Sequence, residues 1–347
     1  MRAYVYESDA KLHLRDWPQP SADSGSTIMR IEACSICGTD LRTYRHGSSR
    51  IDAPRVIGHE VCGELISVGK DVKGFPMGQR VTLTPAVGCG SCLSCRRGHS
   101  NLCRALKTIG FQFDGGFAPY MEVPAVAFEQ GNVNKVPEKI SSEEAAVAEP
   151  IACALNGQEF LHIGSEDSVA IFGSGFIGCL HAELARIMGA SLIIMIGTNP
   201  EKAGQAKRLL PEIHLIDPAK GDMDQKIRQL TGDSGVDVVI TACSSGQAQT
   251  DALRFAAPRG RVSLFGGLSG DSSGFLDSNT IHYKELSVYG AHASTPAQNR
   301  QALEWISQSK LDVKKYIDAV YALEDIDKAF QEVQSKNMLK AIIRSSE

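Results

Sequence analysis

The sequence predicts a two-domain α/β protein, with a doubly wound parallel sheet in the middle of the chain and an antiparallel, barrel-like domain built from its two ends. Three observations predict this fold class. The chain has 347 residues, which is more than one ordinary domain needs. Short apolar runs alternate with amphipathic helical patterns from residue 168 to about 290, as they do in repeated βαβ units. Before residue 148, strands of alternating polarity are broken by Gly- and Pro-rich turns, which is typical of antiparallel sheets.

Each expected element follows from these patterns. Parallel strands are expected at 169–172, 192–196, 214–216, 237–241, 262–265 and 286–289. Strands of the barrel-like half are expected at 27–33, 61–68, 80–84 and 120–123. Two helical patterns, 297–309 and 323–335, and a strand at 340–344 should return to the first domain, because chain ends often lie close together. The expected domains are therefore 1–150 with 291–347, and 151–290.

Composition and charge favour a globular protein with a small-molecule partner. Hydrophobic residues make up 43% of the chain and charged residues 22%, which excludes disordered, collagen-like and coiled-coil classes. The 36 Lys and Arg against 40 Asp and Glu give a net charge of −4, without the basic surplus that favours nucleic acids or anionic membranes. The first residues show no apolar leader, and the densest apolar run is too short to cross a bilayer. We therefore expect a cytoplasmic protein whose ten cysteines stay reduced.

A glycine-rich segment predicts a dinucleotide site. The segment reads Gly173-Ser174-Gly175-Phe176-Ile177-Gly178, directly after an expected strand and at the start of a helical pattern. Gly173 permits the tight turn, Gly175 lets the backbone approach a pyrophosphate, and Gly178 lets helix and strand pack closely. The helix N-terminus then faces the phosphates. We therefore expect this segment, with Phe176 and Ile177, to bind the cofactor.

Gly197 departs from the NAD-type pattern at the end of the second parallel strand. An acidic residue is expected there, because it holds the ribose hydroxyls of NAD. Gly197 is instead followed by Thr198, Asn199 and, further on, Lys202, which offer donors and no carboxylate to repel a 2′-phosphate. We expect these four residues to contact the cofactor and NADP to be preferred over NAD. Because no arginine is present to grip a phosphate, a loop that accepts either cofactor is the alternative.

Four cysteines have the spacing of metal ligands. They are Cys89, Cys92, Cys95 and Cys103, on a short lobe that also contains glycines. Four thiolates complete a tetrahedron and leave no position for a substrate, so the spacing predicts a structural zinc site. Unrelated thiols or a disulfide pair are the alternative, which the lack of an export signal disfavours.

A second candidate metal set is dispersed along the chain and consists of Cys37, His59, Glu60 and Glu149. Together these residues supply the mixed sulfur, nitrogen and oxygen donors of an open, catalytic zinc site. Separately, each has an ordinary alternative: a buried cysteine, a hydrogen-bonded histidine or an acid that caps a helix. Sequence position alone does not show that they meet.

Taken together, these motifs resemble the zinc-dependent medium-chain dehydrogenases. The shared elements, in order, are Cys37-Gly-Thr-Asp, Gly58-His59-Glu60-x2-Gly63, the Cys89 cluster, Asp114-Gly115-Gly116-Phe117, Glu149-Pro150 and Gly173-x-Gly175-x2-Gly178. The resemblance runs the whole chain and is stronger to the sorbitol, polyol and threonine dehydrogenase branch. It implies a catalytic domain similar to the GroES (chaperonin-10) barrel and a Rossmann cofactor domain.

The resemblance also implies roles for the dispersed residues. Cys37 and His59 match the ligands of the catalytic zinc, and Glu60 matches a carboxylate that ligates this metal or exchanges with water. Glu149 stands where the branch has its remaining carboxylate. Thr39 matches the hydroxyl that takes the substrate proton. The expected cofactors are therefore two zinc ions per chain, one catalytic and one structural, together with NADP.

Arg42 is a departure from the family pattern. Many members have a histidine at this position that passes the proton to solvent, and an arginine, which is always protonated, cannot act as that base. A cofactor hydroxyl, water or another side chain such as His46 must then relay the proton. Arg42 with Arg45 attracts an acidic or phosphorylated substrate in one interpretation, and forms part of a solvated surface in the other.

The expected function is that of a zinc-dependent, NAD(P)-linked oxidoreductase that interconverts a secondary alcohol, in a polyol, sugar derivative or hydroxy compound, and its ketone. One alternative is a zinc-free quinone or enone reductase that uses NADPH, which should lack all the metal-ligand positions. Another is a non-catalytic zinc- and cofactor-binding protein, because fold alone does not establish function. A homodimer or homotetramer is expected through the last Rossmann strand. The sequence leaves the substrate open, including whether it is acidic or phosphorylated.

Overall fold

The computed structural model describes residues 1–21, 26–268 and 272–345. They form two compact units: Met1–Ala152 with Ala293–Glu347, and Cys153–His292. The units divide after residues 152 and 292, where the sequence predicts 150 and 290. No helix among the described residues has both the length and the apolar character needed to cross a membrane.

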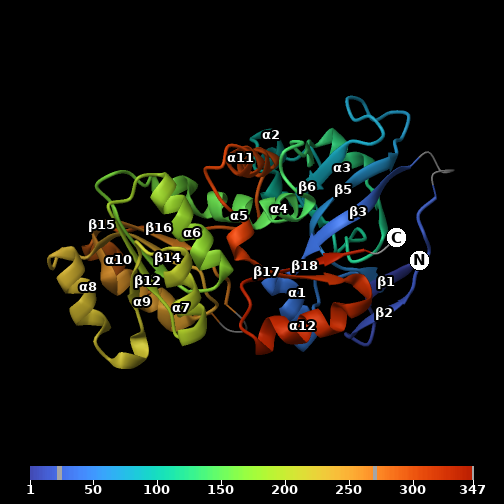
Figure 1. Cartoon of the computed structure of the whole chain (residues 1–347). Coiled ribbons are helices and arrows are strands. Elements are labelled where there is room, and N and C mark those ends of the chain that lie inside the picture. Colours follow the sequence, from blue (N-terminus) through green and yellow to red (C-terminus); the bar gives the residue numbers. More distant parts are fainter. Residues whose placement is uncertain (22–25, 269–271, 346–347) are drawn as a thin grey trace. The chain divides into compact units, whose positions relative to one another are not determined.

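The first unit is built from mainly antiparallel sheets, in which only β17 and β18 pair in parallel among the described strands (Figure 1). Its main sheet has the order β10-β6-β5-β3-β18-β17, and β9 also pairs with β3. These strands are β3 (Thr27–Ser35), β5 (Glu60–Ser67), β6 (Arg80–Leu83), β9 (Tyr120–Val123), β10 (Val133–Lys135), β17 (Ile317–Ala322) and β18 (Lys340–Arg344). Smaller sheets contain β1 (Arg2–Tyr6), β2 (Leu12–Asp16) and β4 (Arg55–Val56), and β7 (Ala86–Val87) with β8 (Lys107–Thr108). The expected antiparallel half is confirmed.

Short helices connect these strands. They are α1 (Gly38–His46), α2 (Leu93–Arg96), α3 (Ala125–Glu129), α4 (Ser142–Ala146), α11 (Pro296–Ser307) and α12 (Ile326–Ser335), and α5 (Ala148–Gln158) begins in this unit. α4 starts with a capping box in which Ser141 and Glu144 satisfy each other's backbone N–H groups, and α11 starts with the same arrangement of Thr295 and Gln298. These caps fix where each helix begins.

The C-terminal segment completes the main sheet and core of the first unit. β18 pairs antiparallel with β3, and α12 packs on β18. Phe330 of α12 lies 5.4 Å from Tyr4 and 6.0 Å from Phe117, measured between ring centroids. The Tyr4 hydroxyl donates a 2.6 Å hydrogen bond to Asp327. Because all three rings are fully buried, the two ends of the chain share one core.

The second unit is a six-stranded parallel sheet with the order β13-β12-β11-β14-β15-β16 (Figure 1). Its strands are β11 (Ser168–Phe172), β12 (Leu192–Ile196), β13 (His214–Ile216), β14 (Val236–Thr241), β15 (Ala256–Leu264) and β16 (Ser287–Gly290). Its helices are α6 (Phe176–Ile187), α7 (Pro200–Leu209), α8 (Met223–Thr231), α9 (Gly246–Phe255) and α10 (Ser278–Tyr283). The strand order reverses between β11 and β14, so the crevice at their carboxyl ends is where doubly wound sheets bind ligands. The expected doubly wound sheet is confirmed.

Three of the elements that differ from the sequence predictions have a clear structural reason. α1 lies in a segment with little apolar periodicity, and its start is fixed by a capping box of Cys37 and Asp40. β17 is an edge strand without a continuous apolar run. β15 begins at Ala256 rather than 262, because its pairing with β14 shifts register and Arg259 adopts a positive φ of 62°. Local propensity did not reveal any of the three.

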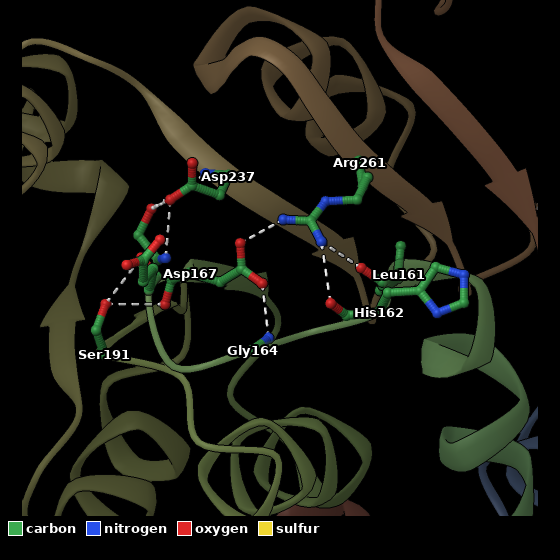
Figure 2. Close-up of polar contacts among 9 residues, drawn as sticks. Leu161, His162, Gly164, Asp167, Ser191, Asp237 and Arg261 are labelled. Atoms are coloured by element: carbon green, nitrogen blue, oxygen red, sulfur yellow. Dashed lines mark hydrogen bonds and ion pairs between the residues drawn. The ribbon is translucent and has the colours of Figure 1, made fainter.

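A polar network ties the amino-terminal ends of the parallel strands to the loop after α5 (Figure 2). Arg261 of β15 donates to the carbonyl oxygens of Leu161 and His162 at 2.6 and 3.2 Å and pairs with Asp167. Asp167 in turn accepts from the backbone N–H of Gly164 at 2.7 Å. One guanidinium therefore satisfies two carbonyls and one carboxylate, which makes Arg261 a connector between strand and loop.

We predict that Arg261→Met lowers the free energy of unfolding by about 2–3 kcal/mol, because it leaves Asp167 Oδ1 and two carbonyl oxygens without the donor that Arg261 supplies. Chemical denaturation measures this change. Arg259→Met is the matched control on the same strand, since Arg259 is 85% exposed and 3.8 Å from Glu285, and it should cost less than about 1 kcal/mol. Equal losses for both variants would contradict the connector role.

Candidate functional site

The start of α1 positions the first candidate metal ligand. Cys37 is the N-cap of α1, and its backbone N–H donates a 2.9 Å hydrogen bond to Asp40 Oδ2. The other oxygen, Asp40 Oδ1, lies 3.5 Å from His59 Nδ1. Asp40 and His59 are both buried. One carboxylate therefore fixes the helix that carries Cys37 and orients the imidazole of His59, in the way that outer carboxylates orient metal-binding histidines.

The carboxylate of Glu60 is held from the side of β18. Its Oε2 accepts hydrogen bonds from Ser35 of β3 and from the ammonium group of Lys340. Lys340 also donates to the carbonyl oxygen of Ile36 at 3.1 Å. Glu60 and Lys340 are 0% and 3% exposed, so this ion pair is fully removed from water. Glu60 Oε1 has no hydrogen-bond partner among the described residues.

Charges determine the protonation of this cluster. Burial alone would lower the pKa of His59, but the charges of Asp40 and Cys37 outweigh it and raise that pKa well above its ordinary value. Burial alone would also lower the pKa of Lys340. The nearby charges of Glu60, Cys37 and Glu149 outweigh this effect and raise that pKa above its ordinary value. Burial raises the pKa of Glu60 despite the opposing charge of Lys340. A cluster this rich in acidic groups attracts a cation.

The donor set fits a divalent metal ion. The ligand atoms of Cys37, His59 and Glu60 all lie within 4.8 Å of one another. They comprise one sulfur, one nitrogen and one oxygen, and the unsatisfied Glu60 Oε1 is the kind of buried atom that a metal would complete. Three protein ligands leave a coordination position open, which a substrate needs.

Two other residues that the sequence singled out lie near this group. Glu149, in the first turn of α5, is not among the three mutually close ligands, but its charge acts on both Glu60 and Lys340. Thr39 is half-buried in α1, between Cys37 and Asp40 in a single turn. Arg42 and His46 are exposed on the same helix, and Arg45 donates a 2.7 Å hydrogen bond from Nε to Gln334.

The cysteine lobe forms a separate cluster in the first unit. The sulfur atoms of Cys89, Cys92, Cys95 and Cys103 all lie within 4.8 Å of one another, and none of the four is in a disulfide. The Cys92 sulfur is 3.5 Å from that of Cys95 and 3.8 Å from that of Cys103. A tetrahedron with zinc–sulfur bonds of about 2.3 Å has edges of about 3.8 Å. These four sulfurs therefore fit a tetrahedral zinc ion.

The environment of the lobe favours thiolates. Backbone N–H groups of Cys89 and Ala105 each donate to the Cys103 sulfur at 3.3 Å. Hydrogen bonds, chiefly from Ser91, lower the pKa of Cys89 to about 5. The pKa of Cys95, in contrast, is raised to about 11, first by burial and then by the neighbouring sulfurs of Cys92 and Cys103. A bound metal would supply a positive charge that lets these thiols ionise together.

The glycine-rich segment adopts the geometry of a dinucleotide-binding turn. Gly173 has a φ of +123°, which an L side chain rarely adopts. Gly175 is the N-cap of α6, and a Cβ atom there would meet nothing within 4 Å, so the helix N-terminus is open to an anion. A Cβ atom on Gly178 would lie 1.9 Å from the Gly173 carbonyl oxygen, so helix and strand pack at backbone distance.

Steric packing also explains why position 197 is a glycine, and the sequence did not reveal this. A Cβ atom at this position would lie 2.4 Å from the Ser174 hydroxyl oxygen and 2.7 Å from its Cβ. Ser174 is buried, so it occupies the volume that a side chain at position 197 would need. Asn199 is the N-cap of α7 and accepts a 3.0 Å hydrogen bond from the Lys202 N–H through Oδ1. Thr198 is exposed beside that helix start.

Sequence reasoning missed three residues that organise the metal-binding cluster. Asp40 stood within the Cys37 motif but was given no role, although its position three residues after an N-cap could have indicated a capping box. Ser35 and Lys340 gave no comparable signal. Lys340 is 280 residues from Glu60, and no local pattern joins the two.

Comparison with known proteins gives consistent results for both units. Residues 23–137 match the family described as Alcohol dehydrogenase GroES-like domain, and residues 177–308 match the family Zinc-binding dehydrogenase. The chain is 35% identical to L-threonine 3-dehydrogenase of Pyrococcus abyssi over 279 residues, 79% of this chain and 77% of the relative. It is 28% identical to sorbitol dehydrogenase of Halalkalibacterium halodurans over 346 residues, 99% of each chain.

A solved structure agrees with these relatives. It is a crystal structure of a putative zinc-binding dehydrogenase from Sinorhizobium meliloti 1021 bound to NADP. The TM-score is 0.88 and the sequence identity 29%, with 99% of this chain and 98% of the other covered. The expected GroES-like and Rossmann folds are confirmed.

We predict that Lys340→Met lowers the free energy of unfolding by about 3–5 kcal/mol, because it leaves the Glu60 carboxylate buried without its counterion. The double variant Lys340→Met/Glu60→Gln should recover most of that loss, since it removes both charges. Chemical denaturation of the two variants measures the difference. Lys336→Met, which removes a partly exposed lysine 2.9 Å from Glu332, is the control and should cost under about 1 kcal/mol. A double variant as unstable as Lys340→Met would contradict a charge effect.

Proposed function

Because this chain belongs to the zinc-type medium-chain dehydrogenases, we propose that its reaction, the interconversion of a secondary alcohol and its ketone, takes place at Cys37 and His59. The protein is an oxidoreductase of the alcohol and polyol dehydrogenase type. The observation that carries the assignment of the site is the open, buried set of sulfur, nitrogen and oxygen donors within 4.8 Å. Polyols, sugar derivatives and other hydroxy compounds are the substrate classes that fit this chemistry.

The residues of the site divide the work. When bound, zinc polarises the alcohol and lowers its pKa, and the nicotinamide accepts the hydride. Cys37 and His59 hold the metal, and Asp40 keeps the imidazole of His59 in the orientation that a ligand needs. Glu60 is the third ligand or exchanges with water, and Glu149 supplies the remaining carboxylate. Thr39 accepts the substrate proton through its hydroxyl.

The departure at Arg42 changes only the last step of proton transfer. An arginine cannot accept a proton at ordinary pH, so Thr39 passes the proton to a cofactor hydroxyl or to water. His46 is exposed and is the last residue of α1. It is a secondary candidate for relaying the proton. This proposal needs no base at position 42.

We also propose a second, structural zinc ion in the cysteine lobe. The Cys92 sulfur lies 3.5 Å from the Cys95 sulfur and 3.8 Å from the Cys103 sulfur, and two backbone N–H groups donate to the Cys103 sulfur. These contacts support a closed tetrathiolate site. A zinc-free enone reductase on this fold would have no use for either donor set, and a non-catalytic binding protein would have no use for the open one. Two zinc ions per chain are therefore part of the proposal.

NADP is the proposed cofactor. Gly197 offers no carboxylate, and the N-terminus of α7, capped by Asn199, carries a partial positive charge that favours a 2′-phosphate. Thr198 and Lys202 add donors near the same helix start. The NADP-bound structure from Sinorhizobium meliloti supports the same choice. Each charge-assisted hydrogen bond to the phosphate is worth about 1.5–3 kcal/mol.

We predict that Gly197→Asp shifts the cofactor preference towards NAD, and that the shift is larger in the double variant Ser174→Gly/Gly197→Asp. The aspartate accepts hydrogen bonds from the ribose hydroxyls and repels the 2′-phosphate, but its Cβ collides with Ser174 unless that side chain is removed. The ratio of kcat/KM for the two cofactors should change by about tenfold or more in the double variant. Ser174→Gly alone is the control. A wild type that clearly prefers NAD would refute the proposed phosphate contacts.

We predict a homodimer or homotetramer that forms through β16. This strand lies at one edge of the six-stranded sheet, and no described strand pairs with its outer side. Such an edge is covered in most proteins, here by the same strand of a second copy. Light scattering should give a mass of twice or four times that of the 37.3 kDa chain. A monomer at working concentration would contradict the prediction.

We predict that one variant in each candidate metal site loses one zinc ion, but that the main loss is of activity in one case and of stability in the other. His59→Ala should lose one zinc ion per chain and about three orders of magnitude or more in turnover, with cofactor affinity nearly unchanged and a smaller fall in melting temperature than Cys92→Ser. Cys92→Ser should lose one zinc ion and lower the melting temperature by about 5–10 °C, because a tetrathiolate site contributes directly to folding. Metal analysis, calorimetry and a screen of sugar alcohols, sugar acids and their phosphates measure these effects. Near-normal activity of zinc-analysed His59→Ala would refute the mechanism.

A further inference from the structure

An aromatic ring connects the metal-binding cluster to a surface arginine. The Phe111 ring centroid lies 5.9 Å from that of His59, with the planes tilted by 57°. The guanidinium carbon of Arg50 lies 5.3 Å from the centroid of the same ring. Phe111 is 7% exposed, whereas Arg50 is exposed. The Phe111 ring thus contacts both the imidazole of His59, a candidate metal ligand, and the permanently charged guanidinium of the exposed Arg50.

Hydrogen bonds hold this arrangement in place. The side-chain amide of Gln112 donates to the Arg50 carbonyl oxygen at 2.8 Å, and its carbonyl oxygen accepts from Thr108 N–H at 3.1 Å. The backbone N–H of Asp52 donates to the Phe111 carbonyl oxygen at 3.1 Å. The backbone of Arg50 is therefore fixed to the segment that carries Phe111. A side chain positioned in this way loses less conformational entropy when it binds a ligand.

The charge of Arg50 has no acidic partner in the part of the chain that the structure describes. Its guanidinium instead makes a cation–π contact with Phe111. Arg55, five residues later, differs because its guanidinium donates to Asp114 at 3.1 Å. A guanidinium has five donors in a fork that matches a carboxylate or a phosphate. The donors of Arg50 are available for such a group.

We propose that Arg50 binds an anionic group of the substrate, a carboxylate or a phosphate, and that the enzyme therefore prefers a hydroxy acid or a phosphorylated polyol to a neutral polyol. The inference rests on the proposed function, because it assumes that the reacting carbon lies at Cys37 and His59. Two ring contacts separate that site from Arg50, so the anionic group lies several bonds from the reacting carbon. The relatives are named for substrates of both classes: threonine carries a carboxylate, and sorbitol is a neutral polyol.

The arginines of α1 are the competing candidates for this role. Arg45 is engaged with Gln334 at 2.7 Å. Arg42 is exposed and makes no contact with His59 or Phe111 that the described residues show. Arg50 differs from both because a buried ring couples it to a metal ligand. Arg42 is therefore the matched control.

The test uses the zinc-loaded enzyme with NADP and a panel of six-carbon substrates. The panel contains the glucitol, mannitol and galactitol series, each as the alditol, the aldonate and the alditol 1-phosphate. Arg50→Gln should lower kcat/KM for the best anionic substrate by about tenfold or more, and leave its alditol within about twofold. Arg50→Lys should retain part of the preference, since lysine keeps the charge but not the fork. Arg42→Gln should change neither.

A binding measurement makes the test independent of turnover. The same aldonates and phosphates are titrated calorimetrically into the enzyme saturated with NADPH, where no oxidation occurs. Arg50→Gln should weaken the binding of the anion by about tenfold, and added salt should weaken it in the wild type. The aldonate and phosphate arms distinguish which anion is recognised.

Four results would overturn the inference. An equal loss for the alditol and its anionic counterparts would show that Arg50 is structural, and a loss in Arg42→Gln instead would assign the role to α1. Unchanged anion binding in Arg50→Gln would refute any contact. A wild type that oxidises alditols best, with the same activity in Arg50→Gln, would overturn this inference and leave the proposed function intact. A wild type that oxidises nothing in the panel would count against the proposed function, and the calorimetric result would still decide the role of Arg50.

Discussion

The buried ion pair between Glu60 and Lys340 is the constraint on which the first unit depends. A carboxylate that is 0% exposed is very costly without a counterion, and the only ammonium group that reaches it among the described residues comes from the first residue of β18. This requirement explains why β18 must pair with β3, since that pairing places Lys340 beside Ser35 and Glu60. The paired strands then place α12 against Tyr4 and Phe117. The geometry of the candidate metal cluster and that of the aromatic core both depend on one strand pairing.

The two candidate metal centres differ in how much of the fold each needs. The cysteine lobe draws all four sulfurs from a stretch of 15 residues, 89–103, and its hydrogen bonds are local. The Cys37 centre draws on β3, α1, β5 and β18, and its charge balance depends on a partner 280 residues away. The lobe can order as a metal binds, as small zinc modules do, whereas the Cys37 centre requires the finished sheet. The local folding of the lobe fits the proposed closed, structural zinc site, and the dependence of the Cys37 centre on the whole sheet fits the proposed open, catalytic site.

Most of the fold followed from patterns that local sequence carries. The parallel strands are nearly continuous apolar runs because both faces of that sheet are buried, and the glycines at 173 and 178 are required by a positive φ and a backbone contact. The dispersed donors were visible as residue types, but their convergence was inferred from resemblance alone. Ser35 and Lys340 were missed because each acts through a tertiary contact, whereas the capping box of Asp40 is local and only its contact with His59 is tertiary. Gly197 was interpreted by charge, whereas Ser174 gives it a packing reason as well.

The position of Lys340 in the chain has a consequence for synthesis on the ribosome. Residues 153–292 precede it, so the parallel sheet is complete and can fold while Glu60 still lacks its counterion. Until β18 emerges, β3 has an open edge on the side where β18 later pairs, and the Cys37 donors cannot be held in their final geometry. The nascent chain therefore acquires its Rossmann fold before its proposed reactive centre. This order delays metal capture at the open site until the polypeptide that surrounds it has been made.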